Sequence, residues 1–198
     1  MIQHLVGNRK IILASNSPRR RELLAGLGLD FEVRTLQGID ESWPSDLQGE
    51  DIPKHISAKK AAAYLPTLAD DELLITADTI VYLDHQVLGK PKDADEARAM
   101  LKRLSGRTHE VITGVTLACR QTEGEVSKTF AVTSLVTFAD LSDAEIDYYI
   151  TNYRPFDKAG AYGIQEWIGY IGVTRLEGSY FNVMGLPVQR LYTELRRF

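Results

Sequence analysis

Apolar positions in the first third of the chain fall into a short continuous run, a helical stripe and a second short run. Residues 10–15 (K-I-I-L-A-S) predict a buried strand, and Ser17 and Pro18 follow as an N-cap with proline in the first helical turn. The leucines that come next share one face, so we expect a helix over about 18–26. A second strand is predicted at 31–35.

The middle of the chain has clearer periodicities. Helical spacing of apolar residues predicts a helix over 50–65, and the β-branched and aliphatic run at 72–83 predicts a strand that ends in a hairpin tip at Asp84-His85. An acidic first turn and one apolar face predict a helix over 93–104.

The second half predicts a long antiparallel hairpin and further helices. Two alternating runs, 109–120 and 126–138, are joined by the polar segment 122–125 (T-E-G-E). Ser142 and Glu145 have the capping-box spacing and predict a helix over 142–152, and a terminal helix follows Pro187. Helices alternating with strands, followed by a hairpin, predict an α/β or α+β fold with a mixed, twisted sheet in a single, two-lobed domain over 1–198.

Composition narrows the class of protein. The chain has 198 residues, of which 44% are hydrophobic and 25% charged, enough for a full core. Its 23 Lys and Arg against 27 Asp and Glu give a net charge of −4, which disfavours nucleic acid as a partner. The single Cys119 forms no internal disulfide, and we find neither a signal peptide nor an apolar run of membrane-spanning length. We therefore expect a soluble cytoplasmic protein that binds no membrane.

The turn between the first strand and the first helix carries the first candidate chemistry. Residues 15–21 (S-N-S-P-R-R-R) place hydroxyls, backbone N–H groups and arginines at a helix N-terminus, where the helix dipole attracts anions. Ser15, Arg19 and Arg20 are thus candidates for a phosphate cradle. The alternative interpretation is an ordinary Ser-Pro cap followed by a solvated basic face.

A lone carboxylate and two lysines follow. Asp78 interrupts the apolar run T-A-D-T-I-V, where a buried carboxylate is unfavourable unless a cation lies beside it. The alternative interpretation is that the strand ends at Asp78 and the carboxylate caps a turn. Lys60 and Lys90, the latter in Gly89-Lys90-Pro91, are candidates for binding a polyphosphate, although lysines on helices are usually solvated. The glycine that a P-loop needs upstream of Gly89 is absent, so a P-loop kinase or GTPase is disfavoured.

The segment 157–165 (D-K-A-G-A-Y-G-I-Q) is the last candidate. Its small residues allow close approach to the backbone, and the amide of Gln165 has the donor and acceptor that can read the edge of a base. A glycine-rich loop without a ligand is the alternative.

Taken together, these motifs resemble the Maf family of nucleoside triphosphate pyrophosphatases over nearly the whole chain. The matching segments are S-N-S-P-R-R at 15–20, A-D-T-I-V at 77–81, G-K-P at 89–91, L-S-G-R-T-H at 104–109, D-K-A-G-A-Y-G-I-Q at 157–165 and G-S-Y-F-N-V-M-G-L-P at 178–187. The resemblance implies an elongated α/β fold like that of the inosine triphosphate pyrophosphatases. It also implies hydrolysis of nucleoside triphosphates to the monophosphate and diphosphate.

The resemblance also implies roles for individual residues. Asp78 matches the proton acceptor, and Glu41 an acidic residue near a divalent metal, Mg²⁺ or Mn²⁺, which Asp78 would share. Substrate contacts are implied for Ser15, Arg19, Arg20, Lys60, Lys90, Thr79, Lys158 and Gln165.

Among the implied substrate contacts, Arg19, Thr79 and Gln165 match the subgroup that prefers dTTP and UTP. A homodimer is a further possibility with this fold. The rival hypothesis is a nucleotide-binding regulator that does not hydrolyse its ligand, since the family is linked to septum formation. A single-stranded nucleic-acid binder fits the acidic chain poorly.

Overall fold

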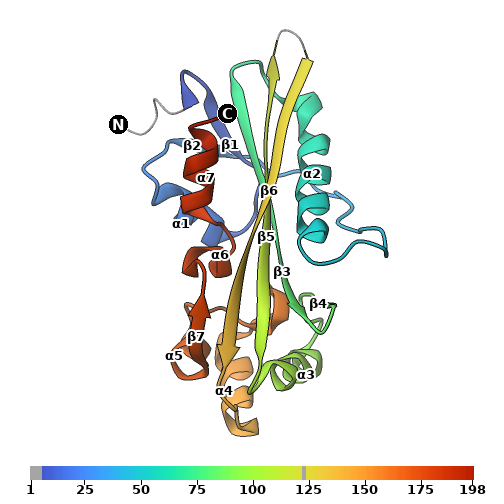
Figure 1. Cartoon of the computed structure of the whole chain (residues 1–198), viewed down its shortest axis with the longest axis vertical. Coiled ribbons are helices and arrows are strands. Elements are labelled where there is room, and N and C mark those ends of the chain that lie inside the picture. Colours follow the sequence, from blue (N-terminus) through green and yellow to red (C-terminus); the bar gives the residue numbers. More distant parts are fainter. Residues whose placement is uncertain (1–5, 122–123) are drawn as a thin grey trace. The chain divides into compact units, whose positions relative to one another are not determined.

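The computed structural model describes residues 6–121 and 124–198. Within them, one seven-stranded sheet has the order β2-β1-β3-β5-β6-β7, with β4 paired to β3 (Figure 1). The strands are β1 (Lys10–Leu13), β2 (Phe31–Val33), β3 (Glu72–Leu83), β4 (Gln86–Leu88), β5 (Thr108–Gln121), β6 (Gly124–Phe138) and β7 (Val173–Glu177). β1 runs parallel to β2 and β3, whereas β4 and β7 pair antiparallel with β3 and β6, so the sheet is mixed as predicted.

The described residues also form helices. They are α1 (Pro18–Ala25), α2 (Asp51–Tyr64), α3 (Ala94–Leu104), α4 (Asp143–Tyr153), α5 (Trp167–Gly172), α6 (Tyr180–Met184) and α7 (Val188–Leu195), with short 3₁₀ turns at η2 (Leu65–Thr67) and η3 (Ala159–Ala161). None of the helices in the described residues is long and apolar enough to cross a membrane.

The chain divides into two compact units. Unit 1 comprises Met1–Asp78, Thr113–Val132 and Gly185–Phe198, and unit 2 comprises Thr79–Ile112 and Thr133–Met184. Strands β3, β5 and β6 contribute residues to both units. The division on β3 falls between Asp78 and Thr79, two neighbouring candidate residues.

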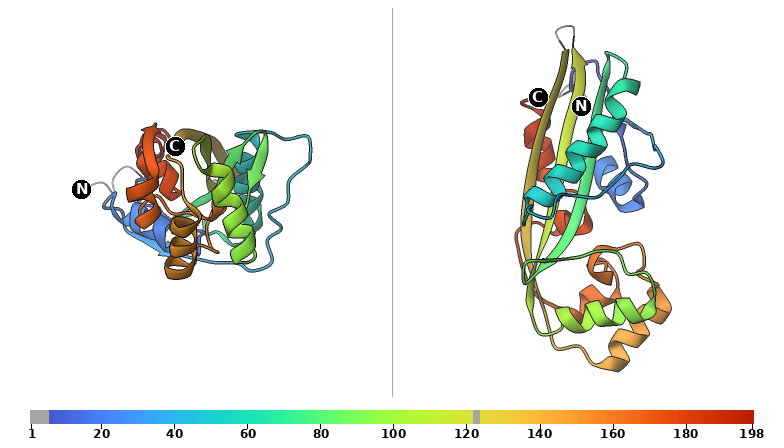
Figure 2. Two further views of the ribbon diagram at one scale, coloured as in Figure 1. Left: turned by 90° about the horizontal axis from the view of Figure 1, so that it is seen from below. Right: turned by 90° about the vertical axis from the view of Figure 1, so that its right-hand side faces the viewer.

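In unit 1 the strands lie between α2 on one face and α1 with α7 on the other (Figures 1 and 2). Ala61 and Tyr64 of α2 pack with Ile12 and Leu74 of the strands in one buried cluster. α2 approaches β5 so closely that a Cβ at Gly114 would lie 2.3 Å from the backbone of Pro53. Glycine at this position therefore lets α2, which carries Lys60, lie directly on the sheet.

Unit 2 has its own core. Helices α3 and α4 contact each other, and α3 also contacts η3. Leu101 and Leu104 of α3 and Tyr149 of α4 are buried in one apolar cluster with Phe138 of β6 and Ile164. This core supports the segment 157–165 that the sequence marks as glycine-rich.

Local signals predict most of these elements. The predicted strand at 72–83 is β3, and the predicted helix at 93–104 is α3, which begins after an Asp93 N-cap. Both halves of the predicted capping box of Ser142 and Glu145 are present. The two alternating runs are β5 and β6, neighbours in the sheet, while Thr122 and Glu123 of the predicted hairpin tip lie outside the described residues. β1 and β2 are shorter than predicted and end at Leu13 and Val33.

Candidate active site

The turn between β1 and α1 is built by its own hydroxyls. The Ser15 Oγ accepts a hydrogen bond from the Ser17 backbone N–H at 3.2 Å, and the Ser17 Oγ accepts one from the Arg20 N–H at 3.4 Å. Pro18 occupies the first turn of α1, as the sequence predicts. Ser15 is 7% exposed, so the turn is held close to the carboxyl end of β1 with the arginines directly after it.

Arg20 is half-buried and anchored by its guanidinium. Its Nε donates to the Gly185 carbonyl oxygen at 2.8 Å, which ties α1 to the start of the C-terminal segment. Burial lowers the pKa of Arg20, helped by the nearby Arg19, and this outweighs the raising effect of the Asp78 and Glu41 carboxylates. Arg20 therefore lies within electrostatic reach of both candidate carboxylates.

Lys60 joins those two carboxylates. From α2, its Nζ donates to Asp78 Oδ1 at 2.8 Å and lies 3.0 Å from Glu41 Oε1. The side chains of Lys60 and Asp78 are each 13% exposed, whereas Glu41 is 55% exposed. The strand therefore does not end at Asp78, since β3 continues through it. The desolvation of the Asp78 carboxylate is offset by the Lys60 ammonium group, which is the cation that the apolar sequence around Asp78 requires.

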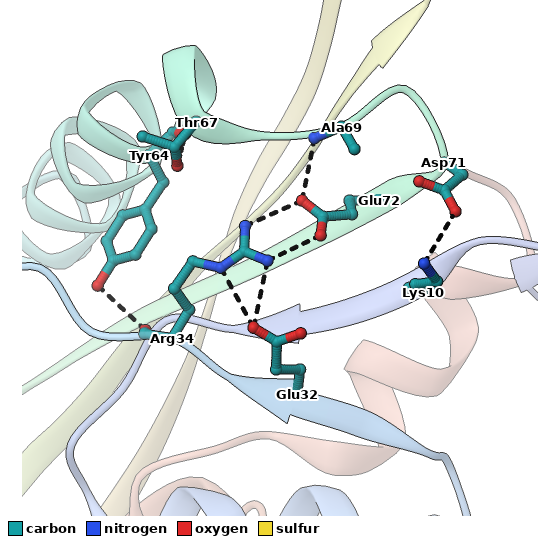
Figure 3. Close-up of polar contacts among 8 residues, drawn as sticks. All are labelled: Lys10, Glu32, Arg34, Tyr64, Thr67, Ala69, Asp71 and Glu72. Atoms are coloured by element: carbon teal, nitrogen blue, oxygen red, sulfur yellow. Dashed lines mark hydrogen bonds and ion pairs between the residues drawn. The ribbon is translucent and has the colours of Figure 1, made fainter.

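A polar network fixes the start of the loop that carries Glu41 (Figure 3). Arg34, directly after β2, donates to both carboxylate oxygens of Glu72 at 2.9 and 2.7 Å and also to Glu32. The Arg34 guanidinium lowers the pKa of Glu72 despite its burial. The Tyr64 hydroxyl donates to the Arg34 carbonyl oxygen at 3.2 Å and accepts from the Leu36 N–H at 2.7 Å.

The middle of the same loop is fixed beside Lys60. Lys59 Nζ donates to Asp40 Oδ2 at 2.6 Å, and Asp40 also accepts from the Ser42 N–H and hydroxyl. These hydrogen bonds, led by that of Lys59, lower the pKa of Asp40. Consecutive lysines of α2 therefore bind consecutive carboxylates of the loop, Lys59 to Asp40 and Lys60 to Glu41. Sequence reasoning did not select Lys59, although its position next to Lys60 was a signal.

The remaining candidates belong to unit 2. Thr79 follows Asp78 on β3 and is half-buried. Lys90 is exposed in the turn after β4, where the Gly89 carbonyl accepts a hydrogen bond from the Gly160 N–H at 3.0 Å. The turn carrying Lys90 is therefore tied to the segment that carries Lys158 and Gln165.

Lys158 has two carboxylate partners within unit 2. Its side chain is 9% exposed, and its Nζ lies 2.7 Å from Asp157 Oδ1 and 3.0 Å from Glu166 Oε1. Gln165 is half-buried, and its Oε1 is a buried acceptor with no hydrogen-bond partner among the described residues. The sequence analysis overlooked Glu166, which directly follows the G-I-Q motif.

Unit 1 therefore brings five of the predicted site residues into one turn-and-carboxylate region: Ser15, Arg20, Glu41, Lys60 and Asp78. Arg19 stands beside Arg20 at the start of α1. Thr79, Lys90, Lys158 and Gln165 lie in unit 2.

Glu41 and Asp78 suit a hard divalent cation. Both are carboxylates turned towards a single positive charge, the Lys60 ammonium. In the described part of the chain, no three His, Cys, Asp or Glu side chains are grouped to hold a metal ion. Mg²⁺ typically takes one or two carboxylates and completes its shell with water and substrate phosphates, so this pair fits it better than it fits zinc.

Comparisons with known proteins show what this chain is similar to. The chain is 63% identical over 188 residues to a dTTP/UTP pyrophosphatase of Phocaeicola vulgatus, covering 95% of each protein. It is 59% identical over 189 residues to a dTTP/UTP pyrophosphatase of Parabacteroides distasonis, covering 96% of each. A solved HAM1 protein from Coxiella burnetii has a TM-score of 0.49 at 14% identity, covering 96% of this chain and all of that one.

The family model that matches is described as Maf-like protein and spans residues 10–198. This match takes in all the candidate residues of both units, from the Ser15 turn to Gln165. With relatives above 50% identity along almost the entire length, the chain belongs to the Maf family.

Proposed function

We propose that this protein hydrolyses dTTP and UTP to the nucleoside monophosphate and diphosphate. The observation that carries the proposal is the Lys60 ammonium between the carboxylates of Asp78 and Glu41, within electrostatic reach of Arg20. The substrates are those in the names of relatives that are 63% and 59% identical to the chain. Modified pyrimidine triphosphates are also candidate substrates.

In the reaction, a water oxygen attacks the α-phosphorus and the bond between that phosphorus and the α–β bridging oxygen breaks. The electron pair of that bond leaves with the diphosphate. Asp78 orients the water and accepts its proton. An ordinary aspartate is a weak base at neutral pH, so its contribution is mainly to align the attacking oxygen.

Asp78 and Glu41 would hold the divalent cation, Mg²⁺ or Mn²⁺. When bound, such a cation offsets the charge of the triphosphate and makes a nearby water more acidic. Lys60, Arg19 and Arg20 neutralise charge that develops on the leaving diphosphate, and each well-placed donor of this kind contributes a few kcal/mol. We assign Ser15, which holds the turn before these arginines, to the same phosphate site because of the family motif that it matches.

We assign Lys90 to phosphate binding, Lys158 to substrate binding, and Arg19, Thr79 and Gln165 to substrate specificity, on the strength of the family motifs that they match. A cytoplasmic location, a homodimer and the absence of nucleic-acid and membrane partners stay predictions.

The test is release of diphosphate from dTTP, UTP, CTP and GTP with Mg²⁺, with and without a chelator. We expect turnover of dTTP and UTP that EDTA abolishes and Mg²⁺ or Mn²⁺ restores. Asp78→Asn should lower kcat/KM by at least about 100-fold, the usual size of a general-base effect. Asp46→Asn, an exposed carboxylate of the loop before α2, is the control and should retain wild-type activity.

Two outcomes would contradict the proposal. Tight binding of dTTP without any diphosphate release would identify a nucleotide-binding regulator instead of an enzyme. Diphosphate release by Asp78→Asn at the wild-type rate would remove Asp78 from the reaction.

A further inference from the structure

The hydroxyl of Tyr149 is inserted into the segment that carries Gln165. Tyr149 lies on α4 and is fully buried. Its hydroxyl oxygen accepts a hydrogen bond from the Gly163 N–H at 3.0 Å and donates one to Glu166 Oε2. One side chain thus holds the residues on both sides of the Ile164-Gln165 pair.

Further contacts close this segment on itself. The Glu166 N–H donates to the Gly163 carbonyl oxygen at 3.0 Å, which forms a tight turn around Gln165. The other carboxylate oxygen of Glu166 lies 3.0 Å from Lys158 Nζ. Glu166 therefore connects the Tyr149 hydroxyl to the buried Lys158 ammonium, and both interactions are charge-assisted.

Three side chains converge on the face of Gly163 where another residue would carry its Cβ. A Cβ built there would lie 3.0 Å from Gln165 Nε2, 3.0 Å from Lys158 Cε and 3.1 Å from Glu166 Cδ. The nitrogen end of the Gln165 amide is therefore packed against Gly163. Its oxygen end is the buried acceptor that lacks a partner among the described residues, so the hydrogen-bonding capacity of this end of the amide is unused within the described chain.

The orientation of that amide determines which pyrimidine it can pair with. Uracil and thymine present a carbonyl acceptor at position 4 next to an N–H donor at position 3, whereas cytosine presents an amino donor next to a ring-nitrogen acceptor. A glutamine amide has one donor end and one acceptor end, so it matches either base, but only in opposite orientations. An amide free to flip would accept both bases.

We propose that Tyr149 is a positioning residue that fixes the orientation of the Gln165 amide, and that this orientation selects uracil and thymine over cytosine. The inference rests on the proposed function, because it takes Gln165 as the residue that reads the base. Tyr149 does not itself touch the substrate. It acts through the Gly163 N–H and the Glu166 carboxylate.

The protonation state of Tyr149 supports this role. Burial and the Glu166 carboxylate raise the pKa of the Tyr149 hydroxyl far above neutral pH. The hydroxyl therefore remains a donor to Glu166 throughout the range in which the enzyme works.

The test compares kcat/KM for dTTP and dCTP in the wild-type protein and in Tyr149→Phe. Removing the hydroxyl leaves the ring in the core but frees Gly163 and Glu166. We expect the dTTP-to-dCTP ratio to fall by between about 10-fold and about 100-fold, the effect of an ångström-scale displacement of a binding group. Amide hydrogen exchange at Gly163 should accelerate in the same variant.

Tyr153→Phe is the matched control. Tyr153 lies one turn further along α4, is 38% exposed, and its ring stacks on that of Tyr149 with centroids 5.2 Å apart. The substitution removes an equivalent hydroxyl from the same stack, so the ratio and the exchange at Gly163 should stay at wild-type values.

The outcomes are distinguishable. Equal losses for dTTP and dCTP, with the ratio kept within twofold, would overturn the inference, since a purely structural role predicts that result. If Tyr149→Phe does not fold, Gly163→Ala perturbs the Gln165 amide from the other side and should lower the same ratio. If the wild type releases no diphosphate at all, the proposed function fails, and calorimetric affinities for dTTP and dCTP in wild type and variant then decide the role of Tyr149.

Discussion

His109 makes the stability of this protein sensitive to acid. It lies near the start of β5, 2% exposed, with its Nε2 2.7 Å from the Tyr162 hydroxyl and its Nδ1 buried without a partner among the described residues. Its ring packs edge to face on those of Phe138 and Tyr162. Burial in these surroundings lowers the pKa of His109 from 6.5 to about 4.

The sign and size of the effect follow from linkage. Because the folded pKa lies below the unfolded one, the unfolded state binds more protons between pH 6.5 and 4, and stability is lost as pH falls through that window. A difference of about 2.5 pKa units corresponds to roughly 3 kcal/mol in total, of which about 2.5 kcal/mol is lost by pH 4.5. Above about pH 6.5 the contribution is constant.

The measurement is urea unfolding at pH 7.5 and 4.5 for wild type and His109→Phe. The variant keeps an aromatic ring but cannot titrate, although it loses the bond to Tyr162 and should be about 1 kcal/mol less stable at pH 7.5. Carboxylates titrate in both proteins, so the difference between the two pH slopes isolates His109. Identical losses of stability in both proteins on acidification would refute the reasoning.

Three further substitutions test ion pairs and backbone packing. Glu72→Gln should lower the free energy of unfolding by about 1–2 kcal/mol. The substitution breaks the bidentate ion pair with Arg34, and the Glu72 side chain in that pair is only 9% exposed. Lys10→Met removes an ion pair of 3.4 Å whose two side chains are 71% and 55% exposed, so it should change the free energy of unfolding by less than about 0.5 kcal/mol. Equal losses for Glu72→Gln and Lys10→Met in urea unfolding would contradict this ranking. Gly160→Ala should lower the free energy of unfolding by about 2–4 kcal/mol, because φ at this position is +67° and the new Cβ would lie 2.9 Å from Val81 Cγ2. An unchanged melting temperature would show that the backbone around position 160 adjusts without loss of stability.

The sequence best predicts features that depend on residues close together in the chain. The Ser17 cap and the Ser142–Glu145 capping box are set within a few residues, and both are confirmed. The strand predicted from the run at 109–120 is confirmed as β5, but residues 111–119 are all buried, so exposure does not alternate along it as predicted. The tip at Asp84-His85 is likewise confirmed, since both residues have positive φ, 52° and 60°.

Contacts between distant segments were harder to foresee. Asp78 inside a strand indicated that a cation must be near, and Lys60 was proposed separately, but the pairing depends on how α2 packs on the sheet. Nothing local to Arg20 indicates the Gly185 carbonyl, 165 residues away. The short elements α5, β7 and α6 lack a full period of pattern, so their bounds were not predicted.

During synthesis, the two units become complete at different times. Unit 2 is drawn entirely from residues 79–112 and 133–184, whereas unit 1 needs Gly185–Phe198 as well as the beginning of the chain. Within that last segment α7 buries Leu191 and Leu195, and Glu194 pairs with Lys128 at 2.5 Å. Since a chain leaves the ribosome N-terminus first, all residues of unit 2 have been synthesised before α7, which unit 1 needs. A nascent chain stopped short of α7 already contains Asp78 and all of unit 2, but lacks the last helix of unit 1.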